Sequence, residues 1–159
     1  MRDGDRQRYG GKGVLAAVAP ANTDIGPNLS KSGRGRKTGS EMTAIYQQWI
    51  TRYPIVSIED GLAENDWEGF RAHTAALGDK VRIVGDDIYV THTEFIAQGI
   101  RNQASNAVLI KLNQIGTVTE TVAAIELCRR AGWNHVISHR SGETEDTFMA
   151  DFEVAMDGG

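Results

Sequence analysis

Several features that mark particular classes of protein are scarce in this sequence. Its single cysteine, Cys128, excludes a disulfide within the chain and makes a reducing cytoplasm the natural setting. The formal net charge of -4 gives no general attraction to nucleic acid or to an anionic membrane. No apolar run approaches the roughly 20 residues of a membrane helix, and the opening MRDGDRQRYGGKG lacks the apolar core of a signal peptide. These scarcities favour a soluble intracellular protein.

What remains is an ordinary globular composition, 40% hydrophobic and 24% charged over 159 residues, long enough for one domain with a real core. Residues 1–29 are charged and glycine-rich, with a short helical pattern that Pro20 should end. Residues 30–40 contain no apolar side chain and are predicted to be a solvated linker. A nucleic-acid patch is the weaker alternative for the linker, because no aromatic residue lies among its cations.

Helical and strand patterns alternate regularly from Thr38 onward. The predicted strands are 55–59, 81–86, 107–111 and 135–139. The predicted helix starts are Thr38, Asn65, Thr91 and Thr117, each with a glutamate three residues later, and a last helix carries Phe148, Met149, Phe152 and Met156.

Strands that alternate with helices in this way predict an α/β fold with a parallel sheet. An open doubly wound sheet and a TIM-type barrel both fit, but no G-x-G-x-x-G turn follows the first strand. Every predicted strand instead ends in an ionisable or imidazole side chain, which is typical of the catalytic end of a barrel. We therefore expect a partial TIM-type (β/α) barrel of about four βα units, because a closed barrel takes about 250 residues.

The strand ends carry the candidate chemistry. Glu59 and Asp86 offer the hard oxygen ligands that suit Mg²⁺. Lys111 ends the next strand, and a neighbouring divalent cation favours the unprotonated amine that a general base needs. His139, Arg140 and Ser141 suit a phosphate group, which a guanidinium can bind through two hydrogen bonds. The pattern predicts metal-assisted proton abstraction next to a carboxylate.

Each of these residues also has a purely structural interpretation. Acidic residues after a strand often cap helices, and a lysine at a strand end often pairs with a carboxylate. His135 and His139 cannot bind one ion from a single strand, since about 3.3 Å per residue separates them too far, so His135 is interpreted as structural. The ordered series of two carboxylates, a lysine and His-Arg-Ser makes chance a poor explanation.

Four stretches resemble the C-terminal barrel of the enolases: VSIEDGLAENDW at 56–67, VGDDIYVT at 84–91, LIKLNQIGTVTET at 109–121 and SHRSGETEDTF at 138–148. Residues 2–25 resemble a segment of the enolase N-terminal domain. The resemblance implies three parts: an N-terminal remnant at 1–29, a linker or junction at 30–40, and a partial (β/α) barrel at 41–159.

The resemblance also implies an activity, the Mg²⁺-dependent reversible dehydration of 2-phosphoglycerate to phosphoenolpyruvate in glycolysis. This is the reaction of a carbon–oxygen lyase, phosphopyruvate hydratase, acting in the cytoplasm. It implies Glu59 and Asp86 as metal ligands and Lys111 as the general base. It further implies that Lys111, His139, Arg140 and Ser141 contact the phosphorylated substrate.

Other enolase motifs have no counterpart in this sequence, among them the third metal-binding carboxylate and the glutamate general acid. The expectation is therefore an internally deleted, C-terminally truncated enolase chain with little turnover. The alternative is a non-catalytic module that binds Mg²⁺ or phosphate, or an interaction module. Open strand edges at 55–59 and 135–139 predict a homo-oligomer or a self-associating chain.

Overall fold

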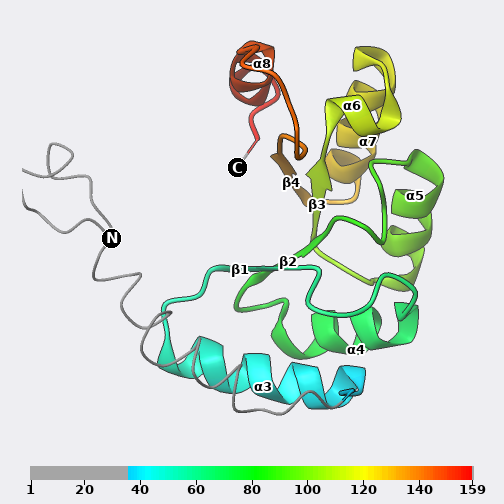
Figure 1. Ribbon diagram of the computed structural model, residues 1–159. Helices are drawn as coiled ribbons and strands as arrows, with labels where there is room; N and C mark the ends of the chain where they lie inside the picture. The colour runs from blue at the N-terminus through cyan, green and yellow to red at the C-terminus, as the bar shows by residue number, and fades with distance from the viewer. Residues whose placement is uncertain (1–35, 159) are drawn as a thin grey trace, which may run out of the picture. The chain divides into compact units, whose positions relative to one another are not determined.

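The structure is a computed structural model that describes residues 36–158 of the chain. The chain divides into two compact units, Met1–Lys37 and Thr38–Gly159. The second unit is the one described below (Figure 1). The predictions made for residues 1–29, including the helix before Pro20, and for the first part of the linker lie outside the described residues. The three-part domain division stays a prediction, although the first described helix already begins at Gly39, inside the predicted linker.

Strands and helices alternate along the described chain, as Figure 1 shows. The four strands are β1 (Ser57–Glu59), β2 (Arg82–Gly85), β3 (Ala107–Ile110) and β4 (Asn134–Ile137). The helices are α3 (Gly39–Arg52), α4 (Trp67–Leu77), α5 (Thr93–Asn102), α6 (Leu112–Ile115), α7 (Val118–Arg130) and α8 (Phe148–Ala155).

All four strands form one sheet in the order β1-β2-β3-β4. Every neighbouring pair is parallel, with Glu59 opposite Val84, Val84 opposite Ala107, and Leu109 opposite Val136. Sequential order in a parallel sheet is the arrangement of a (β/α) barrel, in which each helix returns the chain to the next neighbouring strand. The predicted α/β fold with four βα units is thereby confirmed.

Side-chain caps begin four of the described helices, α3, α4, α5 and α7, and two of the four predicted caps are correct. Thr38 accepts from the N–H of Glu41, and Thr117 accepts from the N–H of Glu120. Helix α4, however, is capped by Asp66 and not by Asn65. Helix α5 begins after His92, whose ring accepts from the N–H of Glu94, so the predicted cap at Thr91 was wrong.

The strands are shorter than the sequence predicted, and one helix was missed. Val56 lies before β1 with 76% of its surface exposed. Lys111 lies just beyond β3, where it forms the N-cap of the short helix α6. His139 likewise lies beyond β4. Glu59 thus ends β1, while the other polar residues predicted at strand ends stand in the loops that follow, which is where barrel enzymes place their chemistry.

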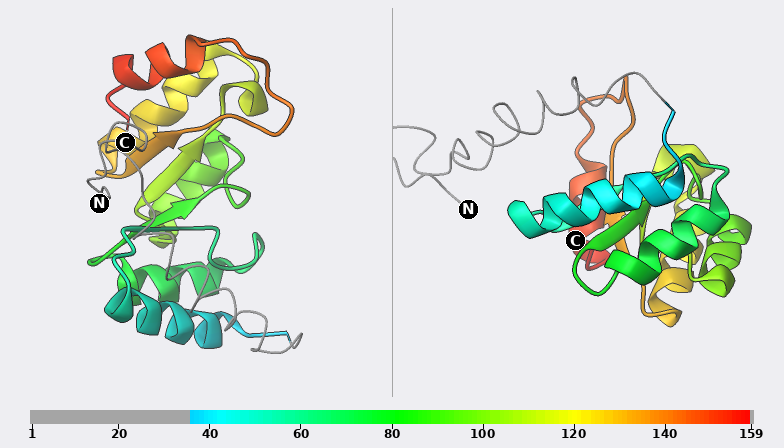
Figure 2. Two further views of the ribbon diagram at one scale, coloured as in Figure 1. Left: turned by 60° about the vertical axis from the view of Figure 1, so that its left-hand side comes forward. Right: turned by 90° about the horizontal axis from the view of Figure 1, so that it is seen from below.

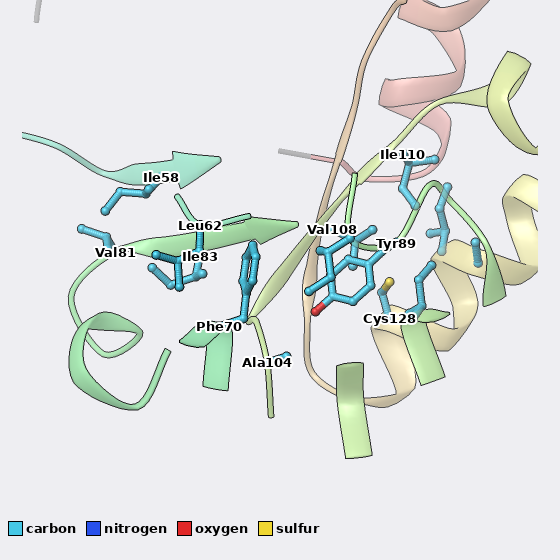
Figure 3. Close-up of a cluster of buried hydrophobic side chains, with 14 of the residues drawn as sticks. Ile58, Leu62, Phe70, Val81, Ile83, Tyr89, Ala104, Val108, Ile110 and Cys128 are labelled. Carbon is cyan, nitrogen blue, oxygen red and sulfur yellow. The ribbon is translucent and has the colours of Figure 1, made fainter. Parts of the chain in front are cut away.

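A hydrophobic core fills the space between the sheet and its helices (Figure 3). Ile83 of β2 and Val108 of β3 point into it, and Phe70 from α4 and Cys128 from α7 meet them there, all fully buried. Burial raises the pKa of the Cys128 thiol to about 12, so this free cysteine stays protonated. Each such side chain stabilises the fold by about 1.5–3 kcal/mol relative to exposure.

Tyr89 occupies the centre of this core, in the loop between β2 and α5. Its hydroxyl donates to Ser105 Oγ over 2.9 Å. Its ring fills the space that a side chain at Gly85 or Gly99 would need, because a Cβ at either glycine would overlap the ring. Those two glycines let the ring pack directly against backbone.

The opposite face of the sheet carries a second, smaller cluster of Val84, Ala107 and Leu109, with Val136 packed against it. Residues alternate between the two faces along each strand, so Ile83, Val108 and Ile110 face the helices while this cluster faces away from them. Figure 2 shows α4, α5 and α7 running along the strands. Among the helices of residues 36–158, none has both the length and the apolar character needed to cross a membrane.

Candidate active site

Strand alternation decides on which face the polar residues lie. Glu59 is opposite Val84 in the register, and Asp86 and Lys111 each follow a member of the smaller cluster by two residues. A shift of two residues returns a side chain to the same face of a strand. The alternation therefore places all three residues on the face away from the helices, at the carboxyl ends of neighbouring parallel strands.

A pocket of about 290 Å³ lies at this edge of the sheet, lined by Glu59, Leu109, Lys111, Ser138, His139, Arg140 and Ser141. Asp86 adjoins the pocket through an ion pair with Lys111. The structure thus brings together all six residues singled out from the sequence. His135 has the structural place expected of it, since it is buried and its Nε2 lies 3.0 Å from the carbonyl of Met156.

Asp86 and Lys111 form the most buried ion pair of the described residues, with Nζ 2.5 Å from Oδ2 and side chains that are 14% and 10% exposed for Lys111 and Asp86. The other carboxylate oxygen, Asp86 Oδ1, is buried and has no hydrogen-bond partner. An unpaired anionic oxygen in a buried place is costly unless a cation or donor meets it. Asp86 is therefore suited to a further positive ligand.

Asp60 holds the end of β2 in place. Its Oδ1 accepts from the N–H of Asp86 over 2.8 Å and its Oδ2 from the N–H of Asp87 over 2.9 Å. Burial raises the pKa of Asp60, although these two hydrogen bonds act in the opposite direction. Partial burial also raises the pKa of Glu59, helped by the negative charges of Asp86 and Asp60 and opposed by Lys111. Crowded anions with raised pKa values gain from a neutralising cation.

These observations fit a magnesium ion. Asp60, Asp86 and Asp87 each offer a carboxylate oxygen within 4.8 Å of the others, and oxygen is the ligand that Mg²⁺ prefers. The unpartnered Oδ1 of Asp86 is the natural first ligand. Glu59 lies close enough to feel these charges but is not a member of the three-carboxylate group, so its role as a ligand stays a prediction.

The loop after β4 supplies the other side of the pocket. His139, Arg140 and Ser141 are exposed there. Glu143 fixes the loop, because its carboxylate accepts from the N–H of Arg140 and from Nδ2 of Asn113, both over 2.9 Å. Asn113 belongs to α6, so Glu143 ties the loop after β4 to the residues that follow Lys111.

Sequence reasoning missed four residues that support the site: Asp60, Asp87, Thr91 and Glu143. Asp60 and Asp87 had a signal, since each adjoins a predicted metal ligand. Glu143 had none, because its partners lie 3 and 30 positions away in the sequence. Thr91 gave a misleading signal, a capping-box spacing with Glu94 that the helix does not use.

Comparison with known proteins agrees with this geometry. Residues 24–159 match the family described as "Enolase, C-terminal TIM barrel domain". The chain belongs to the enolase family. It is 65% identical over 153 residues to Enolase 1 of Methylococcus capsulatus, a match that covers 94% of this chain and 36% of that protein. It is 57% identical over 155 residues to the enolase of Desulfotalea psychrophila, covering 94% of this chain and 37% of that protein.

A third relative, Enolase 1 of Methanospirillum hungatei JF-1, is 52% identical over 149 residues, covering 92% of this chain and 35% of that protein. The chain thus spans about a third of the length of the curated enolases that it matches. The family match agrees with the parallel sheet and with the polar residues that stand where its strands end.

Proposed function

We propose that this chain supplies the base, the cation-binding carboxylates and the phosphate contacts of an enolase site. The reaction would be the reversible dehydration of 2-phosphoglycerate to phosphoenolpyruvate, a carbon–oxygen lyase step of glycolysis in the cytoplasm. The observation that carries the proposal is the Asp86–Lys111 pair beside a pocket that also holds His139 and Arg140. A carboxylate for the cation, a base and an anion-binding group would then adjoin one substrate-sized space.

Asp86, with Asp60, Asp87 and Glu59 around it, would hold Mg²⁺. When bound, the cation would supply positive charge that stabilises electrons moving into a substrate carboxylate. A lysine base used with Mg²⁺ is already known chemistry for the enolase superfamily; the assignment to these residues is our proposal.

Lys111 would take the proton from C2 of 2-phosphoglycerate onto Nζ, and the electron pair of the C2–H bond would move into the adjacent carboxylate. Arg140 would bind the phosphate group through its guanidinium, with His139 and Ser141 as further donors. The exposure of these three side chains leaves them open to an incoming substrate.

Exchange of the C2 hydrogen tests the base without requiring dehydration. In deuterated water with Mg²⁺, we expect the C2 proton signal of 2-phosphoglycerate to disappear as Lys111 removes that proton and solvent deuterium replaces it. Proton NMR follows the signal directly. The step needs a base but no group that assists departure of the hydroxyl, so it isolates the residues that this chain contains.

The Lys111→Met variant should lose the exchange, and omission of Mg²⁺ should slow it strongly. Lys80→Met removes an exposed lysine outside the site and serves as the matched control, with exchange equal to that of the parent. If calorimetry shows that the parent binds 2-phosphoglycerate but NMR shows no C2 exchange, the result supports the alternative function, a module that binds Mg²⁺ or phosphate without catalysis.

Self-association of the chain is also part of the proposal. Within the described residues, β1 pairs only with β2 and β4 pairs only with β3, so each has an edge without a partner strand. On β4 the Glu153 carboxylate already accepts from one edge group, the N–H of Ile137, over 3.0 Å. Light scattering on the 159-residue chain should therefore show a species larger than the 17.3 kDa monomer. A monodisperse monomer that unfolds cooperatively would contradict this.

A further inference from the structure

Two consecutive residues before α5 adopt a backbone conformation that their side chains disfavour. Val90 has φ 45° and Thr91 has φ 59°, in the left-handed region that glycine and asparagine normally occupy. Both residues are β-branched, which makes this conformation a genuine outlier. Such strained residues persist only where the surrounding structure holds them, and they concentrate at functional sites.

The loop that contains them is held from both ends. The carbonyl of Asp86 accepts from the N–H of Tyr89 over 3.0 Å and from that of Val90 over 2.8 Å. The carbonyl of Tyr89 accepts from the N–H of His92 over 2.8 Å. The ring of Tyr89 anchors the middle of the loop in the core. This winding carries the side chain of Thr91 into a fully buried position.

The hydroxyl of Thr91 makes two hydrogen bonds there. It accepts from the backbone N–H of Lys111 over 3.0 Å, and it donates to Oε1 of Gln114 over 3.0 Å. The Lys111 backbone is held at its N–H by this contact and at its carbonyl by the N–H of Gln114 over 3.0 Å, at the point where β3 ends. From that fixed position the Lys111 side chain reaches Asp86.

We propose that Thr91 is a positioning residue for Lys111: its hydroxyl sets where the lysine backbone leaves β3, and thereby aims Nζ at Asp86 and the pocket. The catalytic meaning of this role rests on the proposed function. The position of Lys111 does not, because it can be measured without substrate.

The test compares three variants. Thr91→Val keeps the shape of the side chain and removes both hydrogen bonds, whereas Thr91→Ser restores the hydroxyl. Thr121→Val is the matched control, because Thr121 is also fully buried but bonds only the carbonyl of Thr117 in its own helix region. One readout is hydrogen exchange of the Lys111 amide by NMR. The other is the rate of acetylation of Lys111 relative to the exposed Lys80, by mass spectrometry.

Thr91→Val should speed exchange of the Lys111 amide by about tenfold, the effect of losing one hydrogen bond of ordinary strength, and should raise the acetylation rate of Lys111. Thr91→Ser should restore both to within about threefold of the parent. Thr121→Val should change neither. Equal effects of Thr91→Val and Thr121→Val would overturn the proposal, as would parental values for Thr91→Val.

If Thr91→Val fails to fold, Thr91→Ala decides the question, since it removes the same hydroxyl and alanine tolerates a positive φ better than a β-branched residue. Faster exchange of the Lys111 amide supports the proposal, and unchanged exchange overturns it. A parent chain without C2 exchange would defeat the proposed function alone. The amide and acetylation measurements would still decide the role of Thr91.

Discussion

The two sides of the candidate site are held in different ways. On the side of β1, β2 and β3, Asp86 and Lys111 are largely buried, and backbone hydrogen bonds to Asp60 and Thr91 fix them. On the side of β4, His139 and Arg140 are exposed, and Glu143 is the side chain that holds their loop. The proposed cation and proton chemistry would thus have a preorganised frame, while the proposed phosphate contacts stand on a loop that a substrate could still order.

The largest expected effect on stability comes from a substitution on the buried side of the site, at Asp86. Asp86→Ala leaves the Lys111 ammonium without its partner, which costs about 3 kcal/mol of unfolding free energy for a buried pair. Relief of repulsion from Glu59 and Asp60 offsets part of this cost, so we expect a loss of about 2 kcal/mol. Urea unfolding measures it.

A double variant sharpens that result. Adding Lys111→Met to Asp86→Ala removes the stranded charge and should recover most of the lost stability. Asp79→Ala, at an exposed aspartate of the turn before β2, is the control and should change stability by less than about 0.5 kcal/mol. If the double variant is no more stable than Asp86→Ala, the pair does not behave as a coupled unit.

The next effect is a loss of stability in mild acid that depends on His73. This histidine is fully buried beneath the β1 side of the site, with Nδ1 2.9 Å from Oγ1 of Thr43 and no partner for Nε2. Burial lowers its pKa from 6.5. Its neutral form therefore contributes stability that is fully present above about pH 6.5, the unfolded value, and is lost as the pH falls toward the lower folded pKa.

The His73→Gln variant should flatten this dependence between pH 7 and pH 5, as measured by the midpoint of urea unfolding. The variant His92→Asn keeps an acceptor at the start of α5 and should leave the dependence of the parent in place. An unchanged slope for His73→Gln would show that other groups titrate in this range.

Mg²⁺ affinity should depend on the buried side of the site and not on the exposed side. Asp86→Asn removes the carboxylate with the unpartnered oxygen, and we expect Mg²⁺ affinity by calorimetry to fall at least about tenfold. Arg140→Gln changes the exposed side and should leave Mg²⁺ affinity within about twofold of the parent, because it touches no ligand of the cation. Equal losses of Mg²⁺ affinity in the two variants would contradict separate roles for the two sides of the site.

The smallest expected effect concerns Glu143. Glu143→Gln keeps a carbonyl acceptor but loses the charge that strengthens its bonds to Arg140 and Asn113. We expect global stability to change by less than about 0.5 kcal/mol, while amide hydrogen exchange in residues 138–147 becomes faster. Uniform exchange rates in the parent and the variant would mean that something other than Glu143 orders the loop.

Much of the fold could be predicted because it rests on local patterns. Apolar runs located every strand, and the caps at Thr38 and Thr117 formed as their spacing indicated. The six residues singled out from the sequence lie together for the same reason, since each ends or follows a strand and parallel strands share an edge. Their roles were implied by the family resemblance and stay predictions, because composition and spacing could not supply them.

Among the supporting residues, Asp60 and Asp87 had a signal only as neighbours of predicted metal ligands, and the supporting roles themselves depend on backbone conformation. Asp60 adopts φ 42° and Thr91 adopts φ 59°. A glycine usually signals a positive φ in a sequence, and neither of these residues is a glycine. Thr91 has the spacing of a cap, but its hydroxyl bonds a residue 20 positions away. His92 took over the cap, a role for which histidine is not a preferred residue. At these positions, contacts between residues far apart in the sequence outweighed the local preferences of the residues.

The packing around Tyr89 limits how this chain can diverge. Because its ring occupies the space of two missing side chains, at Gly85 and Gly99, no one of the three positions can change size independently of the others. Alanine at either glycine becomes tolerable only after the ring has been replaced by something smaller, and a smaller residue leaves a cavity until a glycine is filled. The order of substitutions therefore matters, and a library that varies one of these positions at a time would miss the combinations that work.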